Sequence, residues 1–172
     1  LEVPEAPRRP SAFAPGRSRT LRRAGSQQAA VDLRRSYSIC SAVQDADLRV
    51  AIKRTPGGQF STWANDTLKP GVGVEVMPPM GHFNLPLSAD HRKRYLAFAA
   101  GSGITPMLSI IKTTLVAEPH SAFTLVYGNR ASAAVIFREE LAELKDLYRE
   151  RLNIVYVMSR EQQDIELFNG RI

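Results

Sequence analysis

The spacing of apolar and polar residues changes character part-way along this 172-residue chain. Before about residue 88, short stretches with β-branched residues alternate partly with polar positions and stop at Gly and Pro. This pattern predicts short strands in an all-β region, with the topology of a small barrel. The elements predicted there are strands at 36–43, 48–54 and within 69–79, a turn at 55–58 and a short helix at 60–68.

From about residue 94 the pattern becomes that of a parallel sheet with connecting helices. The run RYLAFAA at 94–100 is almost wholly apolar, as is typical of a strand covered on both faces. The elements predicted in this half are strands at 94–100, 122–128 and 153–159 and amphipathic helices at 104–118 and 137–152. This β-α-β-α-β order indicates half of a doubly wound sheet with right-handed crossovers.

Two domains are therefore predicted, a β-barrel at 1–90 and an α/β domain at 91–172, with the boundary in LSADHRKR at 87–94. The barrel lacks room for its first strand. The parallel sheet would normally need two or more further strands. We therefore expect the chain to be an internal fragment of a longer protein.

The formal charge of +6 is concentrated near the N-terminus, since residues 1–35 hold eight arginines against three acidic residues. A basic segment is compatible with nucleic-acid binding, but aromatic residues for base stacking are nearly missing from it. Solvated arginines are the simpler interpretation, with one or two of them available to an anionic ligand. No nucleic-acid partner is predicted.

Other residue types exclude further classes of function. Cys40 is the single cysteine, which excludes an intrachain disulfide and fits a reducing compartment such as the cytoplasm. The three histidines lie far apart, so no metal site is predicted in this chain. Neither a secretion signal nor an apolar stretch of about 18 residues is found, and no membrane span is predicted.

The turn GSGITP at 101–106 lies between a predicted buried strand and a predicted helix. Glycines let a backbone approach a ligand, Thr105 suits the N-cap, and Pro106 suits the first helical position. A helix N-terminus at the carboxyl edge of a parallel sheet offers N–H groups and a positive dipole to a pyrophosphate. A nucleotide-binding turn is predicted, although a turn that merely requires glycine would show the same pattern.

Hydroxyl and basic residues follow the next two predicted strands. Asn129 and Arg130 follow the strand at 122–128, where an acidic residue would otherwise bind a ribose hydroxyl, and Ser159 and Arg160 end the next strand. A hydroxyl with a guanidinium fork suits a 2′-phosphate, which favours NADPH over NADH. Surface arginines without a ligand are the alternative.

The segment RRSYS at 34–38 places a cation, a phenol and a hydroxyl in one predicted strand. Arg35 and Tyr37 would face one side of the strand and Ser38 the other. Such a set would bind a flat aromatic cofactor that carries a phosphate: the cation binds the phosphate, the ring stacks on the cofactor, and the hydroxyl meets its polar edge. Tyr37 considered alone would instead be interpreted as a core residue. In GGQFST at 57–62, backbone N–H groups with Ser61 and Thr62 are suited to an anion-binding nest.

Six segments in this order resemble the ferredoxin–NADP reductase superfamily, whose members join a flavin-binding β-barrel to a Rossmann-like nucleotide domain. The segments are RRSYSI, VAIKRTPGGQFSTW, MPPMGHF, AAGSGITPMLSII, LVYGNR and SREQ. The resemblance covers about residues 13–172, and the ordered set is specific although each piece is not. Four segments are similar to the subgroup of phenylacetyl-CoA epoxidase reductase components, which carry a further plant-type [2Fe–2S] domain. They are RRSYSICSAV, STWAN, MPPMGHF and the terminal LFNGRI.

The resemblance implies FAD and NADPH as cofactors, with a [2Fe–2S] cluster only in a part of the protein beyond residue 172. It implies that Ser38 hydrogen-bonds near flavin N5 and that Thr105 lies close to the flavin, which makes these two the expected catalytic residues. The other flavin ligands that the resemblance implies are Arg35 for the phosphate and Tyr37 for the ring; Val50, Ile52 and Lys53 on the adenine or phosphate side; and Gly58, Phe60, Ser61 and Thr62 at the pyrophosphate. The implied ligands of the nicotinamide nucleotide are Gly101, Gly103, Thr105 and Pro106. Those of its 2′-phosphate are Arg130, Ser159 and Arg160.

The activity implied is hydride transfer from NADPH to flavin N5, followed by one-electron release to an iron–sulfur centre that serves an oxygenase component. Cofactors supply this chemistry, so no acid–base side chain is required. Another reductase of the superfamily, such as a flavohaemoglobin-like one, and a non-catalytic nucleotide-binding module are the alternatives. The sequence departs from the family pattern at Arg17, Ser18 and Arg19 and in the segment 22–35. These departures predict a distorted barrel strand and weak FAD binding by this chain alone.

Overall fold

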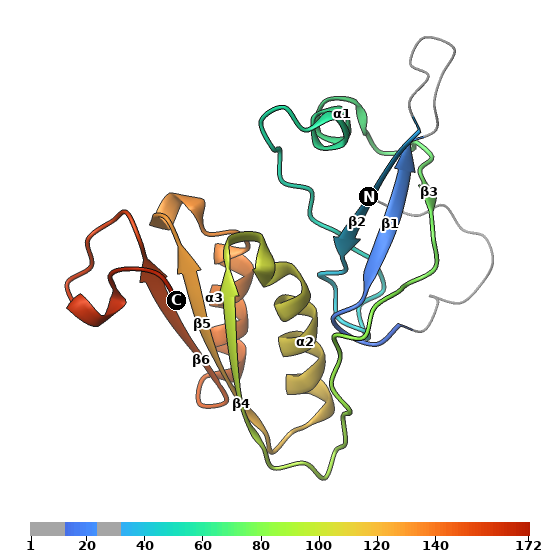
Figure 1. Cartoon of the computed structure of the whole chain (residues 1–172). Coiled ribbons are helices and arrows are strands. Elements are labelled where there is room, and N and C mark those ends of the chain that lie inside the picture. The colour runs from blue at the N-terminus through green and yellow to red at the C-terminus, as the bar shows by residue number, and fades with distance from the viewer. Residues whose placement is uncertain (1–12, 24–31) are drawn as a thin grey trace.

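The computed structural model describes residues 13–23 and 32–172. Within these ranges it contains an antiparallel sheet of order β2-β1-β3 and a parallel sheet of order β4-β5-β6 (Figure 1). The strands and α-helices are β1 (Ser18–Arg23), β2 (Leu33–Ser38), α1 (Gln59–Thr67), β3 (Glu75–Val76), β4 (Arg94–Ala100), α2 (Ile104–Ala117), β5 (Ala122–Asn129), α3 (Arg138–Tyr148) and β6 (Leu152–Met158). Three short 3-10 helices are η1 (Gly101–Gly103), η2 (Ser132–Ala134) and η3 (Glu166–Phe168).

The first strand is regular. All six residues of β1 pair with β2, from Ser18 opposite Ser38 to Arg23 opposite Leu33. The predicted distortion is therefore wrong for β1, whereas residues 24–31 lie outside the described residues. The Arg22 guanidinium is neutralised across the sheet by Asp32 at 3.0 Å and Glu75 at 2.7 Å, so a basic strand is tolerated here. Closure into the predicted barrel is not seen in the described part of the chain.

Two predicted strands of this half are shorter than expected or missing. The strand predicted at 36–43 ends at Ser38, and that predicted at 48–54 is reduced to one bridge between Ile39 and Val50. Between them the chain forms a loop, in which the Ala42 N–H donates to the Asp45 carboxylate at 2.8 Å. The helix predicted at 60–68 is confirmed as α1, and the strand predicted within 69–79 is confirmed as the two-residue β3.

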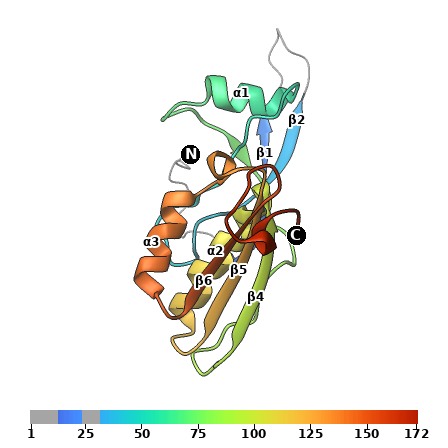
Figure 2. The same ribbon diagram turned by 90° about the vertical axis from the view of Figure 1, so that its left-hand side faces the viewer.

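The parallel half follows the predicted order of elements, with α3 ending at Tyr148 rather than at 152. Both α2 and α3 pack on one face of the sheet, as Figure 2 shows. The opposite face is open among the described residues, and Leu96 and Phe98 on β4 are each 62% exposed. The prediction that 94–100 is covered on both faces is therefore wrong for this structure, because both helices lie on the same side.

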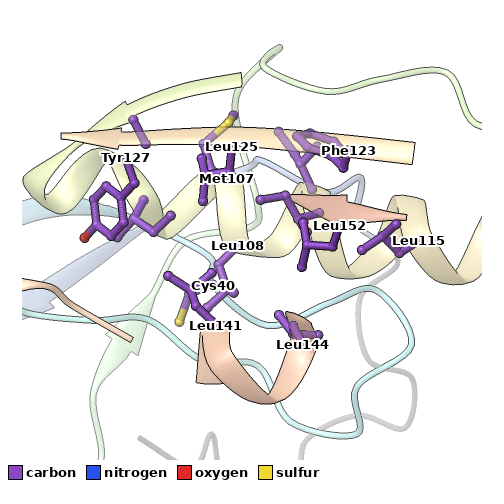
Figure 3. Packing of buried hydrophobic residues seen from close by; sticks show 14 residues of the cluster. Cys40, Met107, Leu108, Leu115, Phe123, Leu125, Tyr127, Leu141, Leu144 and Leu152 are labelled. Atoms are coloured by element: carbon purple, nitrogen blue, oxygen red, sulfur yellow. The ribbon is translucent and has the colours of Figure 1, made fainter. Parts of the chain in front are cut away.

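The main core lies between α2, α3 and the parallel sheet (Figure 3). Cys40, from the loop after β2, is 2% exposed and belongs to the same cluster as Ile104, Leu108 and Leu141. A second, smaller cluster joins α1 to the antiparallel sheet through Leu21, Leu33, Phe60 and Ala64. The loop after β2 therefore connects the antiparallel half to the core of the parallel half.

Over residues 13–23 and 32–172, no helix is long and apolar enough to cross a membrane. The same residues contain no group of three or more His, Cys, Asp or Glu side chains arranged to hold a metal ion.

Candidate functional site

The carboxyl end of β2 carries the predicted flavin residues. Tyr37 is half-buried, and its ring centroid lies 5.8 Å from that of Phe60. Burial raises the pKa of Tyr37 although the Arg35 charge opposes this, so the phenol is neutral at physiological pH. Arg35 is exposed, and its Nη1 donates a 2.7 Å hydrogen bond to the Arg34 carbonyl oxygen. Ser38 is half-buried at the end of the strand.

A cavity of about 550 Å³ lies at the N-terminus of α1. It is lined by residues of β1, β2 and the start of α1, namely Arg23, Leu33, Gly57, Gly58, Gln59, Thr62 and Trp63. The helix has no side-chain cap and no acidic residue in its first turn, so its N–H groups and positive dipole end are available to an anion. The Arg23 guanidinium lies 5.4 Å from the centroid of the Trp63 ring and adds a positive charge there.

Two of the predicted pyrophosphate residues have internal roles. The buried Ser61 hydroxyl accepts a hydrogen bond from the Thr55 N–H at 3.1 Å and donates to the Gly58 carbonyl at 3.2 Å. Phe60 is 1% exposed and packs between Tyr37 and Trp63, so it supports the site as a core residue. Of the four residues predicted at the pyrophosphate, only Gly58 and Thr62 line the cavity at the N-terminus of α1.

A second cavity, of about 510 Å³, involves other residues of α1. It is lined by Val50, Ile52, Ala64, Asn65, Leu68, Lys69, Pro70, Gly71 and Val72. Val50 and Ile52 thus line one cavity together, which is a different cavity from that of Gly58 and Thr62, and their contact with a cofactor stays a prediction. Lys53 is exposed and lines neither of these two cavities.

The predicted nucleotide turn is formed by η1, which leads directly into α2. Gly101 has φ +50°, a left-handed conformation that favours glycine, and added Cβ atoms at Gly101 and Gly103 would meet nothing within 4 Å. The predicted N-cap role of Thr105 is wrong, because α2 begins at Ile104 after Gly103, and the Thr105 hydroxyl donates to the Ser102 carbonyl at 2.9 Å. Pro106 is the third residue of α2 and not the predicted first, because the helix begins two residues earlier. The backbone of the turn is therefore open to a ligand, while Thr105 stabilises it from within.

Tyr127 on β5 is a residue of this site that the sequence reasoning missed. It is fully buried, and its hydroxyl donates to the Gly101 carbonyl at 3.0 Å and accepts from the Ile136 N–H at 3.3 Å. Burial raises the pKa of Tyr127, so its hydroxyl remains a donor across the physiological range. The only signal in the sequence was a phenol within an apolar run.

The residues predicted to bind a 2′-phosphate lie at the carboxyl edge of the parallel sheet. The ladder between β5 and β6 continues past both strands, since the Ser159 N–H donates to Asn129 and the Arg160 N–H to Arg130, each at 2.9 Å. Arg130 and Arg160 are both exposed. Asn129 is 8% exposed, and its side chain interacts with the buried Tyr127 hydroxyl. This edge therefore combines two exposed cations with a buried amide.

The two groups of candidate residues are linked by the chain that follows β2. Ile39, Cys40, Ser41 and Ala42 are all buried, and Cys40 packs into the cluster that contains Ile104. Both views of the ribbon place the carboxyl end of β2 beside the N-terminal part of α2 (Figures 1 and 2). The strand that carries Tyr37 is thus connected to the helix that follows the glycine turn.

Known proteins are similar to this chain in sequence and in fold. Residues 98–172 match the family model of the oxidoreductase NAD-binding domain. The chain is 46% identical over 170 residues to one of the subunits of the 1,2-phenylacetyl-CoA epoxidase of Escherichia coli, covering 99% of this chain and 47% of that relative. It is 40% identical over 161 residues to the ferredoxin reductase component of 3-ketosteroid-9-alpha-monooxygenase of Rhodococcus rhodochrous, covering 93% and 44%. The chain thus spans about half the length of these curated relatives.

Solved structures agree with this assignment. The cytochrome P450 reductase GcoB of Amycolatopsis superposes with a TM-score of 0.75 at 27% identity, over 93% of this chain and 47% of that one. Ferredoxin-NADP+ reductase of Plasmodium falciparum shares the fold with a TM-score of 0.73 at 23% identity, over 87% and 62%. The chain resembles the ferredoxin–NADP reductase superfamily in both sequence and fold. The predicted resemblance, including that to the phenylacetyl-CoA epoxidase subgroup, is confirmed.

In this superfamily a flavin and a pyridine nucleotide are the resident cofactors, and the described residues fit both. The uncapped start of α1 faces a cavity large enough for part of a dinucleotide, with Arg23 on its wall. The open side of Gly101 and Gly103 leaves room for a nucleotide against the backbone. The role of each individual residue stays a prediction.

Proposed function

We propose that this chain is the flavin- and nucleotide-binding part of an NADPH-dependent reductase. Electrons would pass from NADPH through FAD to an iron–sulfur centre that serves an oxygenase of the phenylacetyl-CoA epoxidase type. The observation that carries the proposal is the anchoring of the chain after β2, through Cys40, in the core beneath the glycine turn. The relatives named as ferredoxin reductase components of monooxygenases support the same conclusion.

The residues of the antiparallel half would hold FAD. Arg35 and the first turn of α1 offer positive charge to its phosphates, and Tyr37 offers a neutral ring to its isoalloxazine. Ser38 would place a hydroxyl at the polar edge of that ring. A bound flavin supplies the chemistry, which is acceptance of a hydride and release of single electrons. The protein contributes the placement of the two cofactors at near-attack distance.

The residues of the parallel half would hold NADPH. The backbone of Gly101 and Gly103 would face the nucleotide, while Thr105 keeps the turn closed through Ser102. Arg130, Ser159 and Arg160 would bind the 2′-phosphate at the sheet edge. This division corresponds to the predicted domains at 1–90 and 91–172, and we place the protein in the cytoplasm.

Flavin identification with anaerobic rapid mixing tests the proposal. We expect the protein to bind added FAD and the bound flavin to be bleached by NADPH faster than by NADH. A colourless protein that does not bind added FAD would favour the non-catalytic nucleotide-binding module instead. Reduction that proceeds equally fast with both nucleotides would remove the 2′-phosphate preference but leave the reductase assignment.

A further inference from the structure

Four charged side chains form a closed ion-pair network between the loop after β2 and the two helices of the parallel half. The Lys112 ammonium on α2 lies 2.7 Å from Asp45 Oδ2 and 3.1 Å from Glu140 Oε1. Arg49 Nη2 lies 2.8 Å from the same oxygen of Glu140 and 3.9 Å from the Asp45 carboxylate. Two positive and two negative charges therefore balance across the junction.

Burial makes this network unlike an ordinary surface ion pair. The side chains of Lys112, Glu140 and Asp45 are only 15%, 22% and 27% exposed. Burial opposes the charged form of Lys112, yet its hydrogen bonds to Asp45 and Glu140 raise the Lys112 pKa, so the ammonium is retained. Partly buried pairs are screened by salt much less than exposed ones.

Neutral hydrogen bonds fix the same loop on α2. The Val43 N–H donates to Thr113 Oγ1 at 3.2 Å, and Gln44 Nε2 donates to the Lys112 carbonyl at 3.3 Å. The loop begins at Cys40, only two residues after Ser38 of the proposed flavin strand. On the other side, Lys112 lies about two helical turns after Thr105 of the proposed nucleotide turn. One short path of contacts thus runs from the proposed flavin strand to the proposed nucleotide turn.

We propose that Asp45, Arg49, Lys112 and Glu140 are positioning residues that fix the flavin strand relative to the nucleotide turn. This inference rests on the proposed function. Hydride transfer depends steeply on the separation and alignment of the reacting atoms, so a small displacement between the halves slows it. None of the four residues lines the two cavities described at α1 or belongs to the glycine turn, so the binding of each cofactor alone depends little on them.

The test compares two neighbouring carboxylates of α3 in the FAD-reconstituted protein. Glu140→Gln keeps the shape of the side chain but removes the charge shared by Lys112 and Arg49, whereas Glu143→Gln removes an exposed charge on the same helix. We expect Glu140→Gln to slow anaerobic flavin reduction at saturating NADPH about tenfold or more, with FAD content and NADP+ affinity unchanged. Glu143→Gln and the charge-conserving Lys112→Arg should reduce at nearly the rate of the unmodified protein.

A second readout does not depend on activity. Trp63, the single tryptophan, reports on the antiparallel half by fluorescence, while far-ultraviolet circular dichroism reports on both halves. In the unmodified protein the two urea transitions should coincide, and in Glu140→Gln they should separate because the halves are less coupled. A merely structural role would shift both transitions together.

The outcomes distinguish this inference from the proposed function. If the unmodified protein is not reduced by NADPH, both are overturned. If the unmodified protein is reduced and Glu140→Gln matches Glu143→Gln in rate and in coincident transitions, only the positioning role is overturned. A slower rate with separated transitions supports both.

Discussion

The hydroxyl of Tyr127 donates a 3.0 Å hydrogen bond to the carbonyl oxygen of Gly101, which joins the middle strand of the parallel sheet to the turn after its neighbour. Gly101 has the left-handed conformation of φ +50°, and the Ile136 N–H donates to the same hydroxyl at 3.3 Å. One buried phenol thus supports both the glycine turn and the segment that precedes α3.

Tyr127→Phe removes this hydroxyl and little else. The Ile136 N–H loses this partner, and the Gly101 carbonyl keeps only the Ile104 N–H, so we expect the free energy of unfolding to fall by about 1 kcal/mol. The loosened turn should raise KM for NADPH several-fold with FAD content unchanged, as steady-state kinetics and flavin absorbance would measure. Tyr156→Phe is the control, since Tyr156 lies on the adjacent strand with its ring centroid 6.1 Å from that of Tyr127. Equal behaviour of the two variants would contradict a role for the hydroxyl.

Arg35→Ala should weaken flavin retention. The Arg35 guanidinium donates to a backbone carbonyl and faces solvent, so it is available to a phosphate. Loss of a charge-assisted hydrogen bond predicts about ten- to a hundredfold weaker FAD binding, measured by fluorescence titration. Arg34→Ala is the matched control, because Arg34 lies on the other face of β2 and pairs with Asp32 at 3.2 Å. Unchanged FAD affinity in Arg35→Ala would count against the assignment.

Arg160→Ala should raise KM for NADPH about tenfold or more and leave KM for NADH nearly constant. The reason is that the guanidinium would contact only the 2′-phosphate, which NADH lacks. Steady-state kinetics with both nucleotides measures the ratio, and Arg92→Ala, an exposed arginine before β4, controls for net charge. A parallel rise for both nucleotides would show that Arg160 does not distinguish them.

Sequence reasoning predicted the parallel half well because its elements follow directly from local periodicity. Apolar runs at strand positions and the amphipathic residues of α3 suffice to specify them, and the glycine turn lies where the order of elements requires it. The loop at 41–49 was mistaken for parts of two strands, because the chain that enters it is anchored on α2 rather than in a sheet. Cys40 is buried in the cluster that contains Ile104 and Leu108, and the Val43 N–H donates to Thr113 Oγ1. That burial depends on contacts between residues far apart in the chain.

Site residues were harder to predict than elements. The segment at 34–38 and the residues 129–130 and 159–160 were selected because their chemistry is unusual for strands, and their roles in binding stay predictions. Tyr127 and Glu140 could not, since a tyrosine in a strand and a glutamate on a helix are ordinary until the structure shows their partners. Phe60 and Ser61 fit the family motif, yet the structure shows that they pack and bond within the chain.

Gly16→Ala should be strongly destabilising. Gly16 has φ +85°, and an added Cβ would lie 2.0 Å from the Phe83 carbonyl oxygen and 2.9 Å from Ile110 Cδ1. Left-handed strain with this overlap predicts a loss of about 3 kcal/mol or more in the free energy of unfolding. Gly71→Ala separates the two effects, because Gly71 has φ +89° with nothing within 4 Å and should lose only about 1 kcal/mol. Similar urea midpoints for both variants would refute the overlap.

We predict that Glu118, at the end of the parallel sheet opposite the glycine turn, contributes to the acid sensitivity of the fold. It is fully buried, and its carboxylate is hydrogen-bonded by the His91 ring at 2.7 Å and the Tyr95 hydroxyl at 3.0 Å. Burial alone would raise the pKa of Glu118, but hydrogen bonds from the His91 ring, the Tyr95 hydroxyl and the Ser88 N–H oppose this, and the pKa of Glu118 is lowered.

Because the pKa of Glu118 is lower in the folded state, the ionised carboxylate stabilises the fold at any pH above its pKa in the unfolded chain, which is about 4.3. This stabilisation is lost as the pH falls through the pKa of the folded state. Glu118→Gln should therefore lower stability at neutral pH and remove up to about one proton from the acid dependence of unfolding. Urea midpoints measured from neutral to acidic pH test this, with exposed Glu150→Gln on the loop before β6 as control. Parallel pH profiles for the unmodified protein and Glu118→Gln would show that the acid sensitivity arises elsewhere, because the variant has no carboxylate at this position to take up a proton.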